Sequence, residues 1–223
     1  MNTRMPPVSA NSPAMAGESP PRRRALGWVA VAAVGGVALI VWVLRFGVGN
    51  PAADLPVLGT VPAFTLTAGD GRPVSSDDLR GQVWIADFIF TRCPSQCPMQ
   101  TANMAKVQKA LPADPAGVVR LVSFSVDPAY DTPEVLRAYA ERFGADTTRW
   151  AFLTGDRQAL YTLIREGFHL AVGEEAGGEG MITHSDRFIL VDRDLRIRGY
   201  YSGSDTEAQA RLVRDAAALR ASS

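Results

Sequence analysis

The chain is poor in the side chains that most often bind metals or carry redox chemistry, with two cysteines and two histidines among 223 residues. Its 23 acidic and 23 basic residues cancel, so no net field attracts nucleic acid or an acidic substrate. No internal repeat is visible, and the length suits one ordinary domain with additions rather than two full domains. Any metal or redox site must therefore be built from very few residues.

Charged residues are also missing from residues 25–44, a run of twenty positions. A transmembrane helix needs ~20 apolar residues to cross ~30 Å of hydrocarbon. Trp28 and Trp42 lie near the two ends of the run, where indole side chains favour the membrane interface. The sequence therefore predicts a single transmembrane anchor over residues 25–46.

The flanks of this run predict its orientation. A cluster of three arginines at residues 22–24 lies on one flank only, and positive flanks stay on the cytoplasmic side. We expect a disordered cytoplasmic tail over residues 1–24, a linker over 47–60, and a globular domain over 61–223 in the periplasm, outside the cytoplasmic (inner) membrane. The alternative is a cleaved signal peptide, whose apolar stretch is shorter, about 7–15 residues.

Strand and helix patterns alternate through the exported part. Residues 82–90 and 117–127 are nearly continuous apolar runs of strand length, typical of strands covered on both faces. Residues 61–75 read as an N-terminal β-hairpin around a Gly-Asp-Gly turn. Helical patterns follow the two apolar runs, and a hairpin turning near residues 192–194 precedes a closing helix. This order predicts an α/β fold with a central mixed β-sheet flanked by helices.

Local signals place several boundaries of these elements. Thr132 and Asp156 are expected to cap the starts of two helices, and Gly144 to end the first of them. Residues 168–173, which include His169, read as ordinary extended sheet, and residues 173–180 as a flexible acidic loop.

Both cysteines lie in "FTRCPSQCP", residues 90–98, directly after an apolar run. Pro98 suits the first position of a helix, which would make Cys97 the N-cap and leave Cys93 on the preceding loop. The positive end of a helix lowers the pKa of nearby thiols, so we expect thiolates near neutral pH. A strand that leads into a cysteine pair at a helix start is typical of thioredoxins, in which two residues separate the cysteines; here there are three.

The pair could be a structural disulfide, a redox pair or two soft metal ligands. A disulfide here closes a loop too small to constrain the unfolded chain much, which disfavours the first use. Copper binds thiolates and also imidazole. His184, just before an apolar strand pattern, is the better candidate for a third ligand, because His169 lies in apparent sheet.

Four ordered segments resemble the Sco/SenC family of membrane-anchored copper chaperones. "FTRCPSQCP" is similar to the paired Cys-Pro segment of that family, and "SVDPAYDTPEVLRAYAERF" to its Asp-Pro-x-x-Asp-Thr-Pro segment. "FLTG" and "THSDRFILVD" resemble the following strand and the histidine strand. The likeness covers about residues 55–219. Ser95 stands where many members carry an acidic residue, a change that either eases thiolate formation or weakens metal binding.

The resemblance implies a thioredoxin-like fold that binds one copper ion, Cu(I) or Cu(II), through Cys93, Cys97 and His184. It implies delivery of that copper to the binuclear site of cytochrome c oxidase subunit II or another copper-acquiring protein. Another copper chaperone or a thioredoxin-like reductant is a further expected partner. Some members are thiol-disulfide reductases, so a membrane-tethered oxidoreductase using Cys93 and Cys97 as catalytic thiols is the main alternative.

Other residues have both a functional and an ordinary interpretation. Asp87, within an apolar run, is either a proton acceptor for the thiols or a carboxyl with a hydrogen-bonding neighbour. Asp127 either lies near the site or only ends a strand. Arg92 would serve a third hypothesis, a peroxide-reacting thiol. The remaining candidates are thioether ligands that more often fill cores: Met99, Met104 and Met181.

Overall fold

The computed structural model describes residue 36 and residues 55–94, 96–112, 118–170 and 185–222. The predicted cytoplasmic tail lies outside these residues, as do the transmembrane anchor, apart from Gly36, and most of the linker. Within the described part of the chain, no helix is both long enough and apolar enough to cross a membrane. The chain divides into two compact units, Met1–Val48 and Gly49–Ser223, and all elements described below belong to the second.

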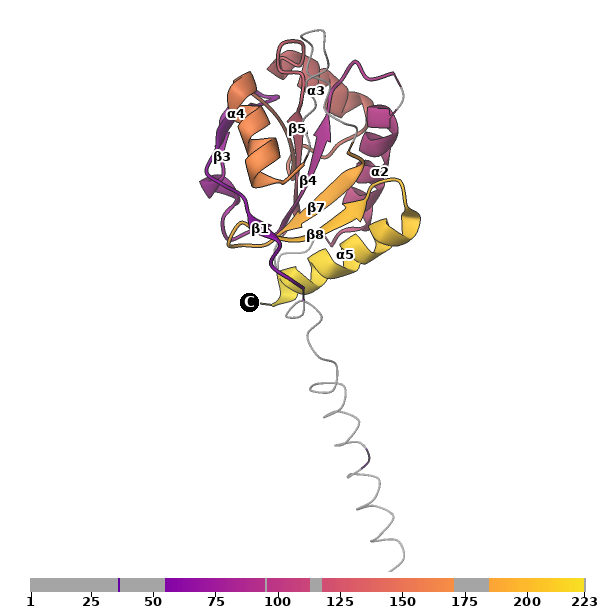
Figure 1. Ribbon diagram of the computed structural model, residues 1–223. Helices are drawn as coiled ribbons and strands as arrows, with labels where there is room; N and C mark the ends of the chain where they lie inside the picture. The colour runs from indigo at the N-terminus through magenta and orange to yellow at the C-terminus, as the bar shows by residue number, and fades with distance from the viewer. Residues whose placement is uncertain (1–35, 37–54, 95, 113–117, 171–184, 223) are drawn as a thin grey trace, which may run out of the picture. The chain divides into compact units, whose positions relative to one another are not determined.

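The described residues of this unit form one sheet of eight strands in the order β1-β8-β7-β4-β5-β6-β2-β3 (Figure 1). The central strands β4, β5 and β6 are parallel, and the other neighbours pair antiparallel. The strands are β1 Gly59–Thr60, β2 Thr65–Ala68, β3 Pro73–Ser75, β4 Trp84–Ile89, β5 Arg120–Ser125, β6 Trp150–Thr154, β7 Arg187–Val191 and β8 Arg196–Ser202. The predicted mixed sheet and the N-terminal β2–β3 hairpin are confirmed.

Four α-helices flank this sheet, with a short 3₁₀ turn η1 (Asp77–Leu79) and a π turn η2 (Leu163–Gly167). The helices are α2 Gln96–Ala110, α3 Pro133–Arg142, α4 Arg157–Thr162 and α5 Thr206–Ala221. α2 connects β4 to β5 and α3 connects β5 to β6, as parallel neighbours require. The carboxyl ends of β4 and β5 therefore meet at one edge of the sheet, where the cysteine loop and the loop after β5 both begin.

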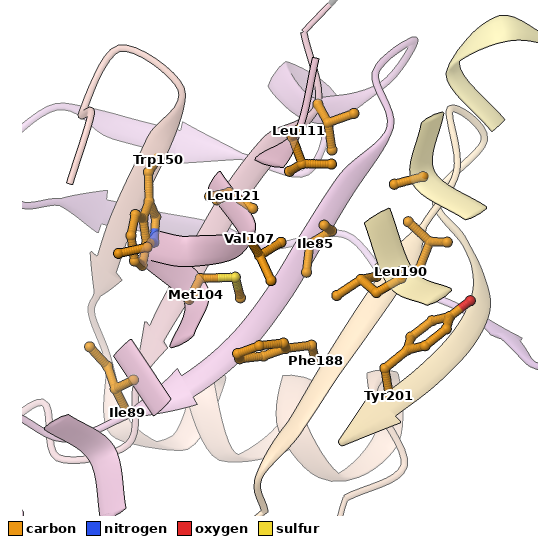
Figure 2. Packing of buried hydrophobic residues seen from close by; sticks show 14 of the residues in the cluster. Ile85, Ile89, Met104, Val107, Leu111, Leu121, Trp150, Phe188, Leu190 and Tyr201 are labelled. Atoms are coloured by element: carbon orange, nitrogen blue, oxygen red, sulfur yellow. The ribbon is translucent and has the colours of Figure 1, made fainter. Parts of the chain in front are cut away.

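Alternation along β4 divides the core into two layers. Ile85 and Ile89 face one cluster, which α2, α3 and α5 cover, and Trp84 and Phe88 face the other, which α4 and η2 cover. Figure 2 shows the first cluster, with side chains from α2 packed against β4, β5 and β7. Both faces of β4 are buried, which explains why its sequence is apolar almost throughout.

Several local predictions are confirmed. Thr132 and Asp156 accept hydrogen bonds from the backbone N–H groups of residues 135 and 159 and so cap α3 and α4. Gly144 follows α3 with a φ of 63°, the left-handed conformation that favours glycine after a helix. The hairpin between β7 and β8 turns where it was expected.

Two predictions are wrong. The helix after the cysteine loop begins at Gln96, so Pro98 is its third residue and Cys97 lies inside the first turn rather than at the N-cap. Proline is still tolerated there because the first N–H groups of a helix have no partner within it. The stretch around His169 is not sheet: residues 168–170 follow the π turn without strand pairing, and His169 has a φ of 53°.

Candidate metal centre

Cys93 and Cys97 lie together where β4 gives way to α2. Neither cysteine is in a disulfide, and each is only 5% exposed. The backbone N–H of Cys97 points at the Sγ of Cys93, 3.4 Å away. The Cys93 sulfur thus occupies the position of a helix-capping acceptor, where the helix dipole favours negative charge.

The Cys97 thiol has a different environment. Burial raises its pKa to about 12, and the neighbouring Cys93 and Asp87 act in the same direction, while the backbone N–H of Phe90 opposes them. The expectation that the helix end lowers the pKa of both thiols is therefore wrong for Cys97, because loss of hydration outweighs the dipole. In the metal-free protein Cys97 is a thiol at neutral pH, and a metal ion that binds it must displace a proton.

A small cavity of about 20 Å³ opens beside Cys97. Its wall is partly apolar, from Phe88, Phe90 and Val126, and partly polar, from Gln96, Gln100 and Ser185. Ser185 directly follows His184 in the chain. His184 itself lies outside the described residues, as do Ser95, Met181 and the acidic loop 173–180.

The sulfur atoms of Cys93 and Cys97 are ligands that suit a soft cation. Two thiols within hydrogen-bonding reach of each other offer the ligand type that Cu(I) prefers. No group of three or more His, Cys, Asp or Glu that could hold a metal is found in the part of the chain that the structure describes. The described residues therefore supply two of the three predicted ligands.

Asp87 is fully buried and lies on the same face of β4 as Ile85 and Ile89. This face packs against the core cluster that contains both cysteines. Its Oδ1 accepts a 2.5 Å hydrogen bond from Ser123 Oγ, which in turn accepts one of 2.9 Å from Trp150 Nε1. Its Oδ2 has no hydrogen-bond partner among the described residues. Burial raises the pKa of Asp87 to about 7, against the opposing effect of the Ser123 hydrogen bond. The hydrogen-bonding neighbour expected from the sequence is Ser123, and a proton-acceptor role remains a hypothesis.

The loop after β5 holds the cysteine loop in place. Asp131, fully buried, accepts hydrogen bonds from the Thr91 backbone N–H at 3.3 Å and from the Thr91 hydroxyl at 2.6 Å. A third hydrogen bond comes from Ser125 Oγ at 2.6 Å. Asp131 escaped sequence reasoning, although it is the second aspartate of the Asp-Pro-x-x-Asp-Thr-Pro segment. It fixes the residue two positions before Cys93.

Asp127 also lies near the site. Its Oδ2 accepts a 2.7 Å hydrogen bond from Arg92 Nε, and the Arg92 guanidinium stacks over the Tyr130 ring at 4.9 Å. Arg92 is therefore directed to the loop after β5, which disfavours its use in a peroxide-reacting site.

Neither Met99, Met104 nor His169 lines the cavity beside Cys97. Met104 is fully buried in the core cluster, which confirms its ordinary interpretation, and Met99 is 63% exposed on α2. His169 is exposed beside Gly59, where an added Cβ would lie 2.9 Å from its Nε2. It is not among the residues that line the cysteine cavity.

The chain is similar to proteins of a known family. The SCO1/SenC family model matches residues 56–219. The chain belongs to the SCO1/SenC family. The SCO1 protein homolog of Bacillus subtilis is 36% identical over 160 residues, which are 72% of this chain and 82% of that protein.

Solved structures of family members agree with the fold. A structure of BsSco, a member of the Sco family of cytochrome c oxidase assembly proteins with an identified disulfide switch, is 34% identical with a TM-score of 0.66. The alignment covers 75% of this chain and 97% of BsSco. Bradyrhizobium japonicum ScoI with copper bound is 27% identical with a TM-score of 0.58, covering 70% of this chain and 99% of ScoI. The chain thus has the thioredoxin-like fold of Sco proteins.

Proposed function

We propose that this protein is a copper metallochaperone that carries one copper ion on Cys93, Cys97 and His184. The observation that carries the proposal is the pair of buried cysteines, not joined in a disulfide, at the start of α2, beside a cavity that Ser185 also lines. Because consecutive Cα atoms are ~3.8 Å apart, the place of Ser185 at this cavity supports His184, the residue before it in the chain, as the third ligand. The copper-bound structure of a relative supports the same reading.

The chemistry of capture follows from the two thiols. Cys93 accepts an N–H at a helix start, a contact that stabilises negative charge on its sulfur when it binds a cation. Cys97 is held as a thiol by burial and loses its proton only when a soft cation replaces it. The apolar part of the cavity wall, from Phe88, Phe90 and Val126, limits the access of water to the ion. Release proceeds by ligand exchange to a docked acceptor.

The acceptor proposed is the binuclear copper site of cytochrome c oxidase subunit II, or another copper-acquiring protein. Membership of a family linked by name to oxidase assembly supports this choice. The apolar run at residues 25–46 would anchor the chain in the cytoplasmic membrane, with the copper domain in the periplasm. A periplasmic domain would face the copper site of an oxidase on the same side of that membrane.

The test is a copper count on the reduced full-length chain in detergent, followed by competition with a chelator. We expect one copper per chain, lost in Cys93→Ser and Cys97→Ser and bound more weakly in His184→Ala. His169→Ala is the matched control and should bind as the unaltered chain does. A Cys93→Ser protein that held one copper as tightly as the unaltered chain would refute the proposal.

A thiol-disulfide oxidoreductase is the second candidate, favoured by the mutual reach of the two thiols. The Cys93 thiolate would attack a substrate disulfide, forming a mixed disulfide and releasing one substrate thiolate. Cys97 would then lose its proton and attack the Cys93 sulfur, which releases the second substrate thiolate and leaves this chain oxidised. A thiol reductant would restore it. Cys97→Ser should trap the mixed disulfide, and His184→Ala should leave this activity intact.

A further inference from the structure

Gln100 is a buried polar residue with an unsatisfied donor next to the thiols. Only 5% of the residue is exposed, and its Nε2 is buried with no hydrogen-bond partner in the described part of the chain. Gln100 lies three positions after Cys97 on α2, a spacing that puts two side chains on the same helix face. Both residues line the cavity of about 20 Å³.

An unpaired buried N–H is costly, so a site that keeps one usually has a use for it. A methionine of similar length would fill the same space without that cost. The glutamine at this position therefore calls for an acceptor that the metal-free, reduced protein does not present.

The cavity narrows the choice of that acceptor. Phe88, Phe90 and Val126 offer apolar side chains only, and neither Gln96 nor Ser185, the polar residues of the wall, accepts a hydrogen bond from the Gln100 amide. The Cys97 sulfur lines the same cavity, and a metal-coordinated sulfur is a strong hydrogen-bond acceptor. A metal ion held by Cys97 would therefore place a strong acceptor at the cavity into which the unpartnered Gln100 amide faces.

We propose that Gln100 is a positioning residue of the copper site, whose Nε2–H donates a hydrogen bond to the Cys97 sulfur in the metal-bound state. This proposal rests on the proposed function of the thiol pair. Together with the Phe90 backbone N–H, Gln100 orients the sulfur. Both donors draw electron density from the thiolate, which favours Cu(I) over Cu(II).

The test compares Gln100→Met with a matched control, Gln108→Met, in the full-length chain in detergent. Gln108 is also a buried glutamine on α2, but its side chain bonds the backbone of Asp146, away from the thiols. The measurements are the Cu(I) dissociation constant, by competition with a chromophoric chelator, and the energy of the sulfur-to-Cu(II) charge-transfer band. We expect Gln100→Met to weaken Cu(I) binding about 10–100-fold and to shift the band to lower energy.

Gln108→Met should leave both copper measurements unchanged while lowering the melting temperature, because it removes two satisfied hydrogen bonds. Metal-free Gln100→Met should melt at the same temperature as the unaltered chain or higher, since it removes an unpaired donor. A lower melting temperature would mean that the amide has a partner in the metal-free protein, and it would overturn the proposal.

The outcomes separate this inference from the function on which it rests. If the unaltered chain binds copper, Cys93→Ser does not, and Gln100→Met matches the unaltered chain in both copper measurements, only the role of Gln100 is refuted. Equal changes in Gln100→Met and Gln108→Met would refute it as well. If the unaltered chain binds no copper, both proposals fail.

Discussion

Replacing Asp87 by asparagine should make the metal-free, reduced protein gain stability relative to the unaltered chain as the pH rises from about 4 to 8. Asp87 is fully buried, and burial raises its pKa from 3.8 to about 7. A carboxyl whose pKa is higher in the folded state binds its proton more tightly there. Its contribution to stability is complete below the unfolded pKa and is lost as the pH rises through the folded pKa.

The size of this effect follows from the two pKa values. The difference between 3.8 and about 7 corresponds to about 4 kcal/mol of unfolding free energy, at ~1.36 kcal/mol per pH unit. Asparagine has no such titration, and its carbonyl oxygen can still accept the hydrogen bond from Ser123. Relative to the unaltered chain, Asp87→Asn should therefore gain about 4 kcal/mol between pH 4 and pH 8.

Urea unfolding of the two proteins at pH 4.5, 6, 7 and 8 measures this gain. Ser123→Ala is the companion variant, because the Ser123 hydrogen bond lowers the pKa of Asp87. Without that bond the loss of stability with pH should become larger. A difference between Asp87→Asn and the unaltered chain that stayed the same at pH 4.5 and pH 8 would refute the reasoning.

Three further predictions concern the cysteine loop. Asp131→Ala should lower the unfolding free energy by about 3 kcal/mol, because it leaves the Thr91 donors unpaired, and it should weaken copper binding; an unchanged urea midpoint would contradict this. In a Cys93→Ser background, Cys97 should react with iodoacetamide at pH 7 at least about tenfold more slowly than a free cysteine, because burial raises its pKa to about 12; alkylation at the rate of free cysteine would argue against that burial. Arg92→Ala should cost less than about 1 kcal/mol, since its side chain is 51% exposed, and a loss above 2 kcal/mol in urea unfolding would show that the ion pair is stronger than its exposure suggests.

Much of the fold could be predicted because its signals are local. The apolar runs of β4 and β5, the caps at Thr132 and Asp156, and Gly144 after α3 each depend on residues within a few positions along the chain. The cysteine pair at a helix start belongs to the same class. The exact start of the helix could not be predicted in this way, since α2 begins at Gln96 rather than at Pro98.

What only the tertiary structure decided involves partners far apart in sequence. The raised pKa of Cys97 comes from burial under the packed core, which overrides the dipole that the sequence pattern suggests. Thr91 meets Asp131 forty positions away, and Ser185 meets Cys97 at one cavity. The sequence by itself determined which side chains were available for soft-metal or redox chemistry. The sheet order, which places β7 beside β4, decided which of them come together, because hydration and long-range contacts depend on the whole packed domain.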